Sequence, residues 1–450
     1  MKTREILNNC NFCKAPLTHL VTDLGMQPLC EERIKPEEIN HMEPHFPLKV
    51  YVCEKCFLVQ VPESVTPDII YRDYGYYSSY SDTWLEHAKH YVERTIPRFN
   101  ISKESLVAEI ASNDGYLLQY FVAKNIPVIG IDPALKCAEY AEKEKGVRTE
   151  TKFFGLETAG YLTERYGKAD LIIGNNVLAH VPDINDFVEG MKFFLKPGGI
   201  ITMEFPHLQR LVEENQFDTI YHEHFSYFSF TTVRNIFKKY EIELFDVDEL
   251  ATHGGSLRIY GHHQDDRTQS VHPRVNELLK REKSLGICTM DFYDSFNEKV
   301  KETKRKILEF LIQAKREGKS VVGYGAPGKG NTLLNYCGVR TDFLDYTVDR
   351  SPHKQGNYLP GTHIPIYHPD RLKTTKPDYV FILPWNLKDE IISHHKYIYD
   401  WGGKFVVPIP EITIIGRDSS LKQIRQLNPE DDRYTISNLQ DHRENPTINY

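Results

Sequence analysis

The sequence predicts an α/β protein in three parts: a small cysteine-anchored module, a central doubly wound sheet, and a second α/β unit of Rossmann type. Three observations predict this. Two C-x-x-C pairs lie near the N-terminus, apolar strands alternate with helices between residues 105 and 206, and the same alternation returns after residue 320. Strands that alternate with helices favour a parallel sheet covered by helices on both faces.

Length and composition set the class of protein. The 450 residues exceed one ordinary domain, so two or three domains are expected. Hydrophobic residues make up 40% and charged residues 26%, as in a globular protein in water, and the formal net charge of -8 gives no reason to bind nucleic acid or an anionic membrane. No stretch approaches the roughly 18 apolar residues of a membrane-spanning helix, so we expect a cytoplasmic protein.

The two C-x-x-C pairs predict a zinc site. Each pair brackets a tight turn that directs two thiolates at one point, and four thiolates match tetrahedral Zn²⁺. Such a site leaves no open position for water, so the zinc is expected to be structural; four free thiols are the alternative. Cys30 is an unpaired extra thiol between the pairs, which leaves the choice of ligands slightly open. The expected ligands are Cys10, Cys13, Cys53 and Cys56.

A tyrosine-rich stretch, YRDYGYYSSYSD, follows the module. So many tyrosines are costly to leave exposed, so this loop is expected to cover another surface or a ligand. Ser81 is a candidate N-cap for an amphipathic helix that runs from Trp84 towards Ile96.

The central unit contains a candidate nucleotide loop, EIASNDG, directly after the apolar strand LVAEI. Ligands of doubly wound sheets bind beyond the carboxyl ends of the strands. Glu109 ends the first strand, Gly115 permits close backbone approach, and Asp132 ends the next strand, where a carboxylate can accept bonds from both ribose hydroxyls. These features are typical of a class I S-adenosylmethionine site; an ordinary βα turn is the alternative, because Ala111 and Asn113 stand where glycines are usual.

A charged helical spacer, about residues 264 to 318, leads to the second α/β unit. Its loop GYGAPGKG holds G-x-G-x-x-G, and Asp349 follows at the spacing of a dinucleotide fingerprint. That pattern predicts NAD, but Pro327 and Lys329 equally suit a helix N-terminus that receives phosphate. The stretch after Asp349 adds donors that match a pyrophosphate, so a nucleotide-sugar pocket explains both halves. These donors are Arg350, His353, Lys354 and His363.

The motifs resemble, in order and over nearly the whole chain, the zinc-containing, S-adenosylmethionine-dependent sugar C-methyltransferases that act on nucleotide-linked keto-deoxysugars. They are C-x-x-C…C-x-x-C, YYSSYSDTW, EIASNDGYLL, NNVLAHVPD, YHEHFSYFS, HGGSLRIY, GYGAPGKGNTLLNYCG and KQGNYLPGTHIPI. The resemblance implies a zinc module (residues 1–70), a methyltransferase domain (71–263), and a helical spacer with a C-terminal nucleotide-sugar domain (264–415). A polar tail (416–450) follows, and a monomer is expected.

The resemblance also implies roles for individual residues. His224 is similar to the family's general base, with Tyr221 and Glu223 beside it; His180 faces the substrate, and the role of His222 stays open. The residues expected at the cofactor are Tyr77, Ser79, Glu109, Ala111, Asn113, Gly115, Tyr116, Asp132, Pro133, Asn175 and Asn176. The residues expected at the substrate are Tyr76, Lys329, Asn331, Arg350, Lys354 and His363.

Carbon methylation needs a carbanion, so the expected substrate is a 4-keto sugar deprotonated at C3. A histidine suits that proton transfer, and His180, Tyr221 or His222 are candidate donors to the enolate oxygen. Three alternatives stay open: an NAD-dependent sugar-nucleotide oxidoreductase or epimerase, an inactive zinc-anchored binding protein, and an O- or N-methyltransferase. The nucleotide is not identified by the sequence.

Overall fold

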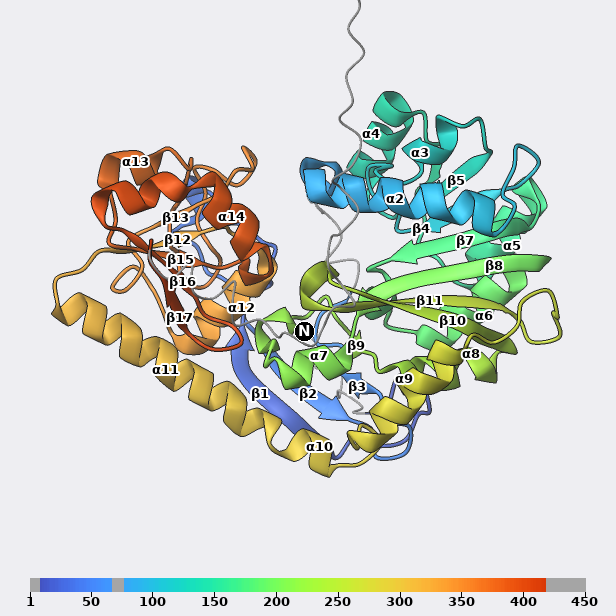
Figure 1. Cartoon of the computed structure of the whole chain (residues 1–450), viewed down its shortest axis with the longest axis horizontal. Coiled ribbons are helices and arrows are strands. Elements are labelled where there is room, and N and C mark those ends of the chain that lie inside the picture. Colours follow the sequence, from blue (N-terminus) through green and yellow to red (C-terminus); the bar gives the residue numbers. More distant parts are fainter. Residues whose placement is uncertain (1–8, 67–76, 418–450) are drawn as a thin grey trace, which may run out of the picture.

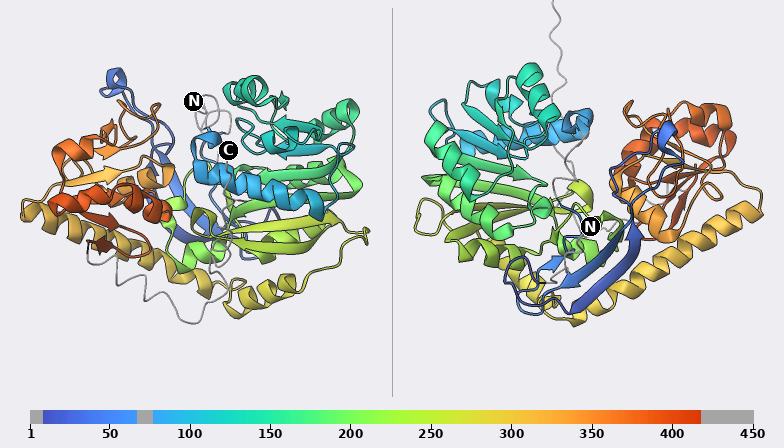
Figure 2. Two further views of the ribbon diagram at one scale, coloured as in Figure 1. Left: turned by 45° about the horizontal axis from the view of Figure 1, so that its top comes forward. Right: turned by 180° about the vertical axis from the view of Figure 1, so that it is seen from behind.

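The computed structural model describes residues 9–66 and 77–417. Two α/β units lie side by side, and a small N-terminal sheet with the long helix α11 (Phe296–Arg316) bridges them (Figure 1). Seen from behind, strand β1 (His19–Gln27) runs between the two units beside α11 (Figure 2). The candidate substrate residue Tyr76 lies outside the described residues.

The N-terminal sheet has the order β1-β2-β3-β9 and is antiparallel throughout. Strands β2 (Phe46–Val52) and β3 (Val59–Gln60) belong to the cysteine-rich segment, and the short helix η1 (Pro36–Glu38) precedes them. Strand β9 (Ser226–Tyr227) comes from the YHEHFSYFSF stretch. Alternate residues of β2 are buried, as expected for a strand with one face on the core. The first 60 residues therefore complete their sheet with a strand from the central unit.

The central sheet has seven strands in the order β10-β11-β8-β7-β4-β5-β6. Five are parallel: β4 (Val107–Ile110), β5 (Val128–Ile131), β6 (Thr149–Glu150), β7 (Ala169–Asn175) and β8 (Leu195–Pro206). The predicted doubly wound sheet is confirmed. It is extended by a hairpin the sequence reading did not include, in which β11 (Ser256–His263) lies antiparallel between β8 and β10 (Ile242–Leu250).

Helices cover both faces of this sheet (Figure 1). Helix α2 (Asp82–Arg98) begins where Ser81 Oγ accepts a hydrogen bond from Trp84 N at 3.3 Å, which confirms the predicted N-cap. Its buried face carries Ala88, Tyr91, Val92 and Thr95, at helical spacing. The other helices of this unit are α3 (Gln119–Val122), α4 (Leu135–Lys145), α5 (Leu156–Tyr166), α6 (Ile184–Phe194), α7 (Leu208–Glu213) and α8 (Phe230–Lys239). Four short helical turns complete it: η2 (Ser78–Tyr80), η3 (Leu178–His180), η4 (Phe217–Thr219) and η5 (Thr252–Gly254).

Three helices, α9 (Pro273–Ser284), α10 (Asp291–Asp294) and α11, lead to the C-terminal unit. The C-terminal sheet has the order β14-β13-β12-β15-β16-β17, with β17 antiparallel. Its strands are β12 (Val321–Tyr324), β13 (Thr347–Val348), β14 (Ile366–Tyr367), β15 (Tyr379–Ile382), β16 (Lys404–Val407) and β17 (Thr413–Ile415). Its helices are α12 (Gly328–Cys337), α13 (Arg371–Thr375), η6 (Trp385–Leu387), α14 (Lys388–His394) and η7 (Lys396–Trp401).

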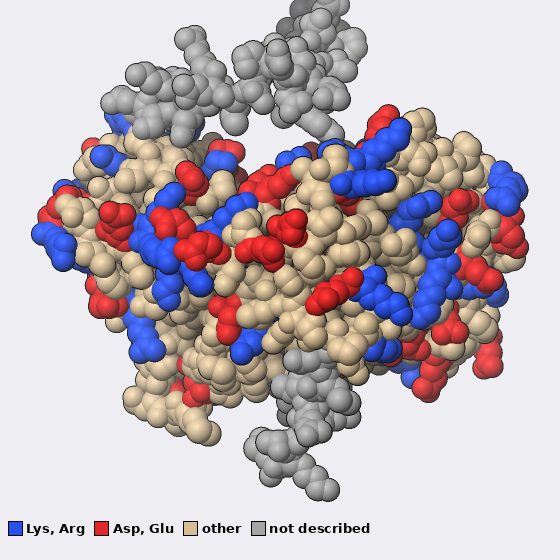
Figure 3. Space-filling view, turned by 90° about the horizontal axis from the view of Figure 1, so that it is seen from below, with Lys and Arg blue, Asp and Glu red and all other residues tan. Residues whose placement is uncertain are grey.

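Helix α12 carries the C-terminal unit onto the centre of the molecule, where it packs against η4 and β1. The view from below shows acidic and basic side chains interspersed rather than one basic surface (Figure 3). Within the described ranges, every helix is too short or too polar to cross a membrane.

Candidate active site

The four cysteines of the C-x-x-C pairs converge at one point. Their sulfur atoms all lie within 4.8 Å of one another, with Cys10 Sγ 3.5 Å from Cys56 Sγ and Cys13 Sγ 3.5 Å from Cys53 Sγ. Four thiolates at such distances fit the donor set of structural Zn²⁺. The two turns are alike, since each places one residue in the left-handed region, Lys14 at φ 60 and Phe57 at φ 59.

Cys30 lies outside this cluster. It is buried, and its Sγ is 3.8 Å from the carboxylate oxygen Oε1 of Glu223. The question that the sequence left open about zinc ligands is therefore answered for the described residues: the quartet is complete without Cys30. Cys30 instead lies against the stretch that carries the candidate base.

The loop after β4 is built from left-handed residues. Ala111, Asn113 and Gly115 have φ values of 57, 50 and 76, which turn the chain sharply and leave the end of the strand uncovered. A Cβ on Gly115 would lie 3.1 Å from Val147 Cγ2 and 3.2 Å from Ala141 Cβ, so this position also needs a small residue for packing.

Two buried polar side chains stand at the carboxyl ends of adjacent strands. Glu109 of β4 is fully buried, and neither carboxylate oxygen has a hydrogen-bond partner in the described chain; the same holds for both side-chain atoms of Asn175, at the end of β7. Burial raises the pKa of Glu109 well above its usual value; the Tyr116 hydroxyl lies near enough to oppose that shift, although its geometry falls short of a full hydrogen bond. Buried polar groups without partners require an explanation, and a polar ligand with its own donors, such as S-adenosylmethionine, fits these two.

Asp132 follows the next strand, β5, as predicted. Its carboxylate accepts hydrogen bonds from Asn113 N and Ala134 N, both at 2.9 Å, and burial raises its pKa to about 6. Each carboxylate oxygen has a second acceptor position, so Asp132 both fixes the loop and can accept from a ribose. Pro133 follows it and is half-buried.

The segment before α2 is tied onto this loop. Ser78 N donates to Asn113 Oδ1 at 2.9 Å, and both the backbone N–H and the hydroxyl of Ser79 donate to Asp114 Oδ2. The Tyr77 ring packs 5.6 Å from that of Tyr140 on α4. The prediction that the tyrosine-rich segment covers a site thus has a structural basis in its described part.

His224 is the candidate base, and its surroundings determine its protonation. It lies in an irregular turn in which His224 N donates to Tyr221 O at 3.0 Å. The Nδ1 atom is 3.1 Å from the carbonyl oxygen of Thr219, so Nδ1 carries the hydrogen and Nε2 has a free lone pair. Burial, aided by the neighbouring His180, lowers the pKa of His224 well below its usual value. The ring is therefore neutral near pH 7 and able to accept a proton.

The three polar residues of YHEHF, His222, Glu223 and His224, have different surroundings. The His180 ring, from η3, lies 4.7 Å from the His224 ring, and it is held by a hydrogen bond to the backbone of Glu223; burial lowers its pKa to about 4. His222 packs on the N-terminal module, with its ring 5.9 Å from that of Phe46. The two histidines of YHEHF are therefore not equivalent.

Glu223 is fully enclosed, and burial, with the nearby carboxylate of Glu31, raises its pKa to about 8. The carboxyl group is thus largely protonated at pH 7 and can donate a hydrogen bond. Tyr221 lies against His224, with ring centroids 4.1 Å apart. The turn therefore carries a neutral imidazole with a phenol against it, and a neutral carboxylic acid that lies beside Cys30.

The C-terminal unit holds the segment that leads into Tyr221. Trp385 Nε1 donates to the buried Asp218 Oδ2 at 2.6 Å, and Thr332 Oγ1 donates to Ile220 O at 3.0 Å. Lys329 lies over the Trp385 ring at 4.6 Å. Asp218 and Trp385 were missed by sequence reasoning; the only signals were a carboxylate inside the apolar run QFDTIY and a tryptophan after the strand VFILP.

The HGG turn, residues 253–255, lies where Trp385 of the C-terminal unit approaches the central unit. A Cβ on Gly254 would lie 2.6 Å from the Trp385 ring, so the motif permits close contact between the two units. Asn176 Nδ2 is 3.0 Å from the ring nitrogen Nε2 of His253 in the same turn. The turn therefore connects the predicted cofactor residues with the C-terminal unit.

The contacts of the loop GYGAPGKG do not match those expected of a dinucleotide-binding loop. Asp349 Oδ2 accepts from Ala326 N at 2.8 Å, and the amino group of Lys354 donates to Ala326 O at 2.7 Å. At the start of α12, Gly328 N donates to the Glu31 carboxylate at 3.0 Å. The chain's own groups thus use the donors and the acidic residue that NAD would need, which argues against the oxidoreductase alternative.

The remaining predicted substrate residues lie in three places. Asn331 donates to Cys30 O at 2.5 Å, near Glu223. Arg350 follows β13 and lies 3.5 Å from Glu390. His363 pairs with Glu43 of the N-terminal module at 3.1 Å, so its described contact is with the protein itself.

Three family models match successive parts of the chain. They are described as "Putative zinc binding domain" (residues 10–71), "Methyltransferase domain" (residues 84–247) and "C-methyltransferase C-terminal domain" (residues 251–410). The C-methyltransferase NovU of Streptomyces niveus is 34% identical over 415 residues, covering 92% of this chain and 98% of that protein. The ubiquinone biosynthesis O-methyltransferase of Bordetella avium is 32% identical over 96 residues, 21% of this chain and 39% of its own length.

Solved structures also match the central part of the chain. The magnesium protoporphyrin IX methyltransferase of Synechocystis with bound S-adenosylmethionine is 14% identical, with a TM-score of 0.30 over 39% of this chain and 78% of its own. An S-adenosylmethionine-dependent methyltransferase of Anabaena variabilis is 17% identical, with a TM-score of 0.32 over 38% of this chain and 83% of its own.

Proposed function

Since the chain belongs to the S-adenosylmethionine-dependent C-methyltransferase family, we propose that it methylates C3 of a nucleotide-linked 4-keto-deoxysugar. One observation carries this proposal: the buried, neutral His224, with Nδ1–H fixed on Thr219 O and Nε2 free. Carbon methylation requires removal of a proton from carbon, whereas many oxygen and nitrogen acceptors react without so well prepared a base.

In the proposed reaction His224 Nε2 takes the proton from C3, which lies beside the C4 carbonyl and is therefore acidic. The electron pair moves onto the carbonyl oxygen and forms an enolate, while the proton stays on the imidazole. We assign the donation to that oxygen to the protonated Glu223 and the Tyr221 hydroxyl, and His180 bonds to the backbone of Glu223. S-adenosylmethionine, when bound, supplies the electrophilic methyl group that C3 accepts.

The C-terminal unit also contributes to the proposed site. Lys329 is half-buried near Asp218, and its positive charge helps to lower the pKa of His224, so we assign it a favourable electrostatic effect on the enolate. Burial lowers the pKa of Lys329, and the charge of Asp218 opposes that shift. We assign the diphosphate of the substrate to the loop after β13, where the half-exposed Arg350 follows Asp349.

The test offers the protein S-adenosylmethionine labelled with ¹³C in the methyl group, together with a panel of nucleotide-linked keto-deoxysugars. Under the proposal the label appears on a carbon of the sugar, at the methyl chemical shift of a C–CH₃ group. Label on oxygen or nitrogen, or no transfer across the panel, would refute it.

A second measurement isolates the base. In D₂O without the methyl donor, the wild-type protein should exchange the C3 hydrogen of the keto sugar for deuterium. His224→Ala should lower that exchange by about 10²–10⁴-fold, because general base catalysis contributes that factor. His222→Ala is the matched control, since His222 packs on Phe46, and it should retain the exchange. Equal loss in both variants would contradict the assignment of His224.

A further inference from the structure

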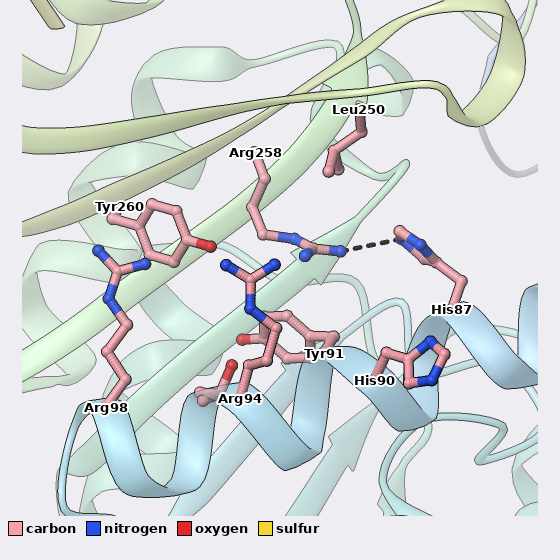
Figure 4. A pocket seen from close by; sticks show the side chains of 9 residues that line it. His87, His90, Tyr91, Arg94, Arg98, Leu250, Arg258 and Tyr260 are labelled. Carbon is pink, nitrogen blue, oxygen red and sulfur yellow. Dashed lines mark hydrogen bonds between the residues drawn. The ribbon is translucent and has the colours of Figure 1, made fainter. Parts of the chain in front are cut away.

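A pocket lies between α2 and the β10–β11 hairpin, outside the candidate active site (Figure 4). Its volume is about 120 Å³, or roughly four water molecules at ~30 Å³ each. Three arginines line it, Arg94, Arg98 and Arg258, together with two histidines and two tyrosines. So many cationic donors around a small cavity indicate an anionic occupant.

The acidic groups beside the pocket neutralise only part of this charge. Arg258 is 4% exposed and pairs with the buried Glu204, and Arg98 pairs with Asp246. Arg274 binds both Asp246, through two hydrogen bonds of 2.6 Å, and Asp248, at 2.7 Å, so four arginines near the pocket face the three carboxylates of Glu204, Asp246 and Asp248. Arg94 is exposed at the mouth of the pocket and forms no ion pair or hydrogen bond with any described residue, so its guanidinium is available to an anion there.

Arg258, which lines the pocket, also carries a buried donor without a partner in the described chain. The Nε atom of Arg258 has no hydrogen bond within the described chain, although Nη2 of the same guanidinium lies 2.9 Å from His87 Nε2. An unpaired buried N–H costs about 1–3 kcal/mol, and a charged one more. The guanidinium lines the pocket, so its charge acts on an occupant of the cavity even though Nε itself is shielded from it.

We propose that this pocket binds a tetrahedral oxyanion of the phosphate class. Arg258 approaches from the sheet, whereas Arg94 and Arg98 approach from α2, so donors reach the cavity from two sides (Figure 4). A tetrahedral oxyanion presents oxygens in several directions and suits this arrangement, while a carboxylate presents two oxygens in one plane. The forked N–H groups of each guanidinium match the oxygens of such an anion.

The pocket shares a wall with the predicted cofactor site but is distinct from it. Trp84 stacks on His87, with ring centroids 4.9 Å apart, and also on Tyr116 at 5.9 Å. His87 lines the pocket and Tyr116 is a predicted cofactor residue, so the Trp84 ring stands between the two sites and we expect that both can be filled together.

The test is isothermal titration calorimetry, in which inorganic phosphate is titrated into the full chain at constant ionic strength. The wild-type protein should bind one phosphate per chain, and Arg94→Ala should weaken binding at least tenfold. Arg94→Lys keeps the positive charge but loses the paired N–H groups of the guanidinium, so its phosphate affinity should lie between those of the wild-type protein and Arg94→Ala. The matched control is Arg316→Ala, which removes an exposed, unpartnered arginine at the end of α11 and should change the affinity less than twofold.

Four results would overturn the proposal. The first is that the wild-type protein binds no phosphate. The second is that Arg94→Ala and Arg316→Ala lose the same phosphate affinity, and the third is that saturating S-adenosylmethionine abolishes phosphate binding. The fourth is acetate binding as tightly as phosphate, since it would indicate a carboxylate site instead. Because the readout is binding, none of these results depends on the proposed sugar substrate.

Discussion

The hydrogen bond from Trp385 to Asp218 links the C-terminal unit to the catalytic turn, and Trp385→Phe tests how. The substitution keeps an aromatic ring and removes the N–H that donates to Asp218 Oδ2 at 2.6 Å. Asp218 is fully buried, and its Oδ1 has no other partner in the described chain, so the carboxylate loses a charge-assisted bond. Such a bond is worth about 1.5–3 kcal/mol.

The sign of the pH dependence follows from the pKa of Asp218. Burial raises that pKa from 3.8 to about 6, while Lys329 and the Trp385 N–H oppose the rise. A raised pKa means that the folded state binds the proton more tightly than the unfolded chain, so stability falls as the pH rises from 3.8 through 6. At 1.36 kcal/mol per pKa unit, the charged carboxylate costs about 3 kcal/mol above pH 6.

Removal of the indole donor raises this pKa further, so Trp385→Phe should lose most stability where Asp218 is charged. The expected loss of unfolding free energy in urea is about 1.5–3 kcal/mol at pH 8, and nearer ~1 kcal/mol at pH 5, where a neutral bond is lost. The turnover number should also fall, because Thr219, next to Asp218, holds Nδ1 of His224.

Trp401→Phe is the matched control. Trp401 Nε1 donates to a neutral acceptor, Pro377 O, at 3.0 Å, so its loss should cost the same at both pH values and leave turnover unchanged. Trp401→Phe should be destabilised equally at pH 5 and pH 8. If Trp385→Phe is also destabilised equally at both pH values, the indole of Trp385 does not stabilise the charge on Asp218.

Three further outcomes are expected. Cys53→Ser should release zinc and lower the melting temperature, whereas Cys30→Ser should keep one zinc per chain by atomic absorption; loss of zinc from Cys30→Ser would contradict the quartet. Glu223→Gln should keep activity within about threefold at pH 7, since the pKa of Glu223, about 8, leaves its carboxyl group protonated there. The variant should also lack the loss of activity that the wild-type protein shows above pH 8. A collapse of activity at pH 7 would indicate that the Glu223 carboxylate anion is needed. Because burial holds the pKa of His224 well below 6.5, the rate of C3 exchange should stay flat from pH 7, where Glu223 is still protonated, down to 6.5, and a fall centred at 6.5 would show an exposed imidazole instead.

Local patterns explain why much of the architecture was predictable. Strands β4, β5, β7, β12 and β15 are short apolar runs, and the residues that end β4 and β5, Glu109 and Asp132, lie where parallel strands place ligand-binding groups. The C-x-x-C turns likewise encode their own geometry. Each of these features depends on residues that are close together in the sequence.

Long-range pairings could not be read in the same way. Nothing in the sequence near Ser226 shows that it pairs with Gln60, or that Glu31 caps a helix 297 residues away. The antiparallel position of β11 was missed for the same reason, because an apolar strand carries no mark of its neighbour's direction. The bond from Trp385 to Asp218 spans 167 residues, and a tryptophan and an aspartate alone do not indicate it.

The pairing of β3 with β9 has a consequence for synthesis of the chain. The cysteine quartet closes within the first 56 residues, so the metal can bind early, but the edge of β3 stays unpaired until residue 227 has emerged. At the usual 5–20 residues per second, the wait is roughly 10–30 s. During that interval an exposed strand edge is open to aggregation, and a fragment that stops before residue 226 keeps that edge permanently. The first module is thus left incomplete until the segment that carries β9 has been made, and expression of the module alone should require a supplied β9 peptide.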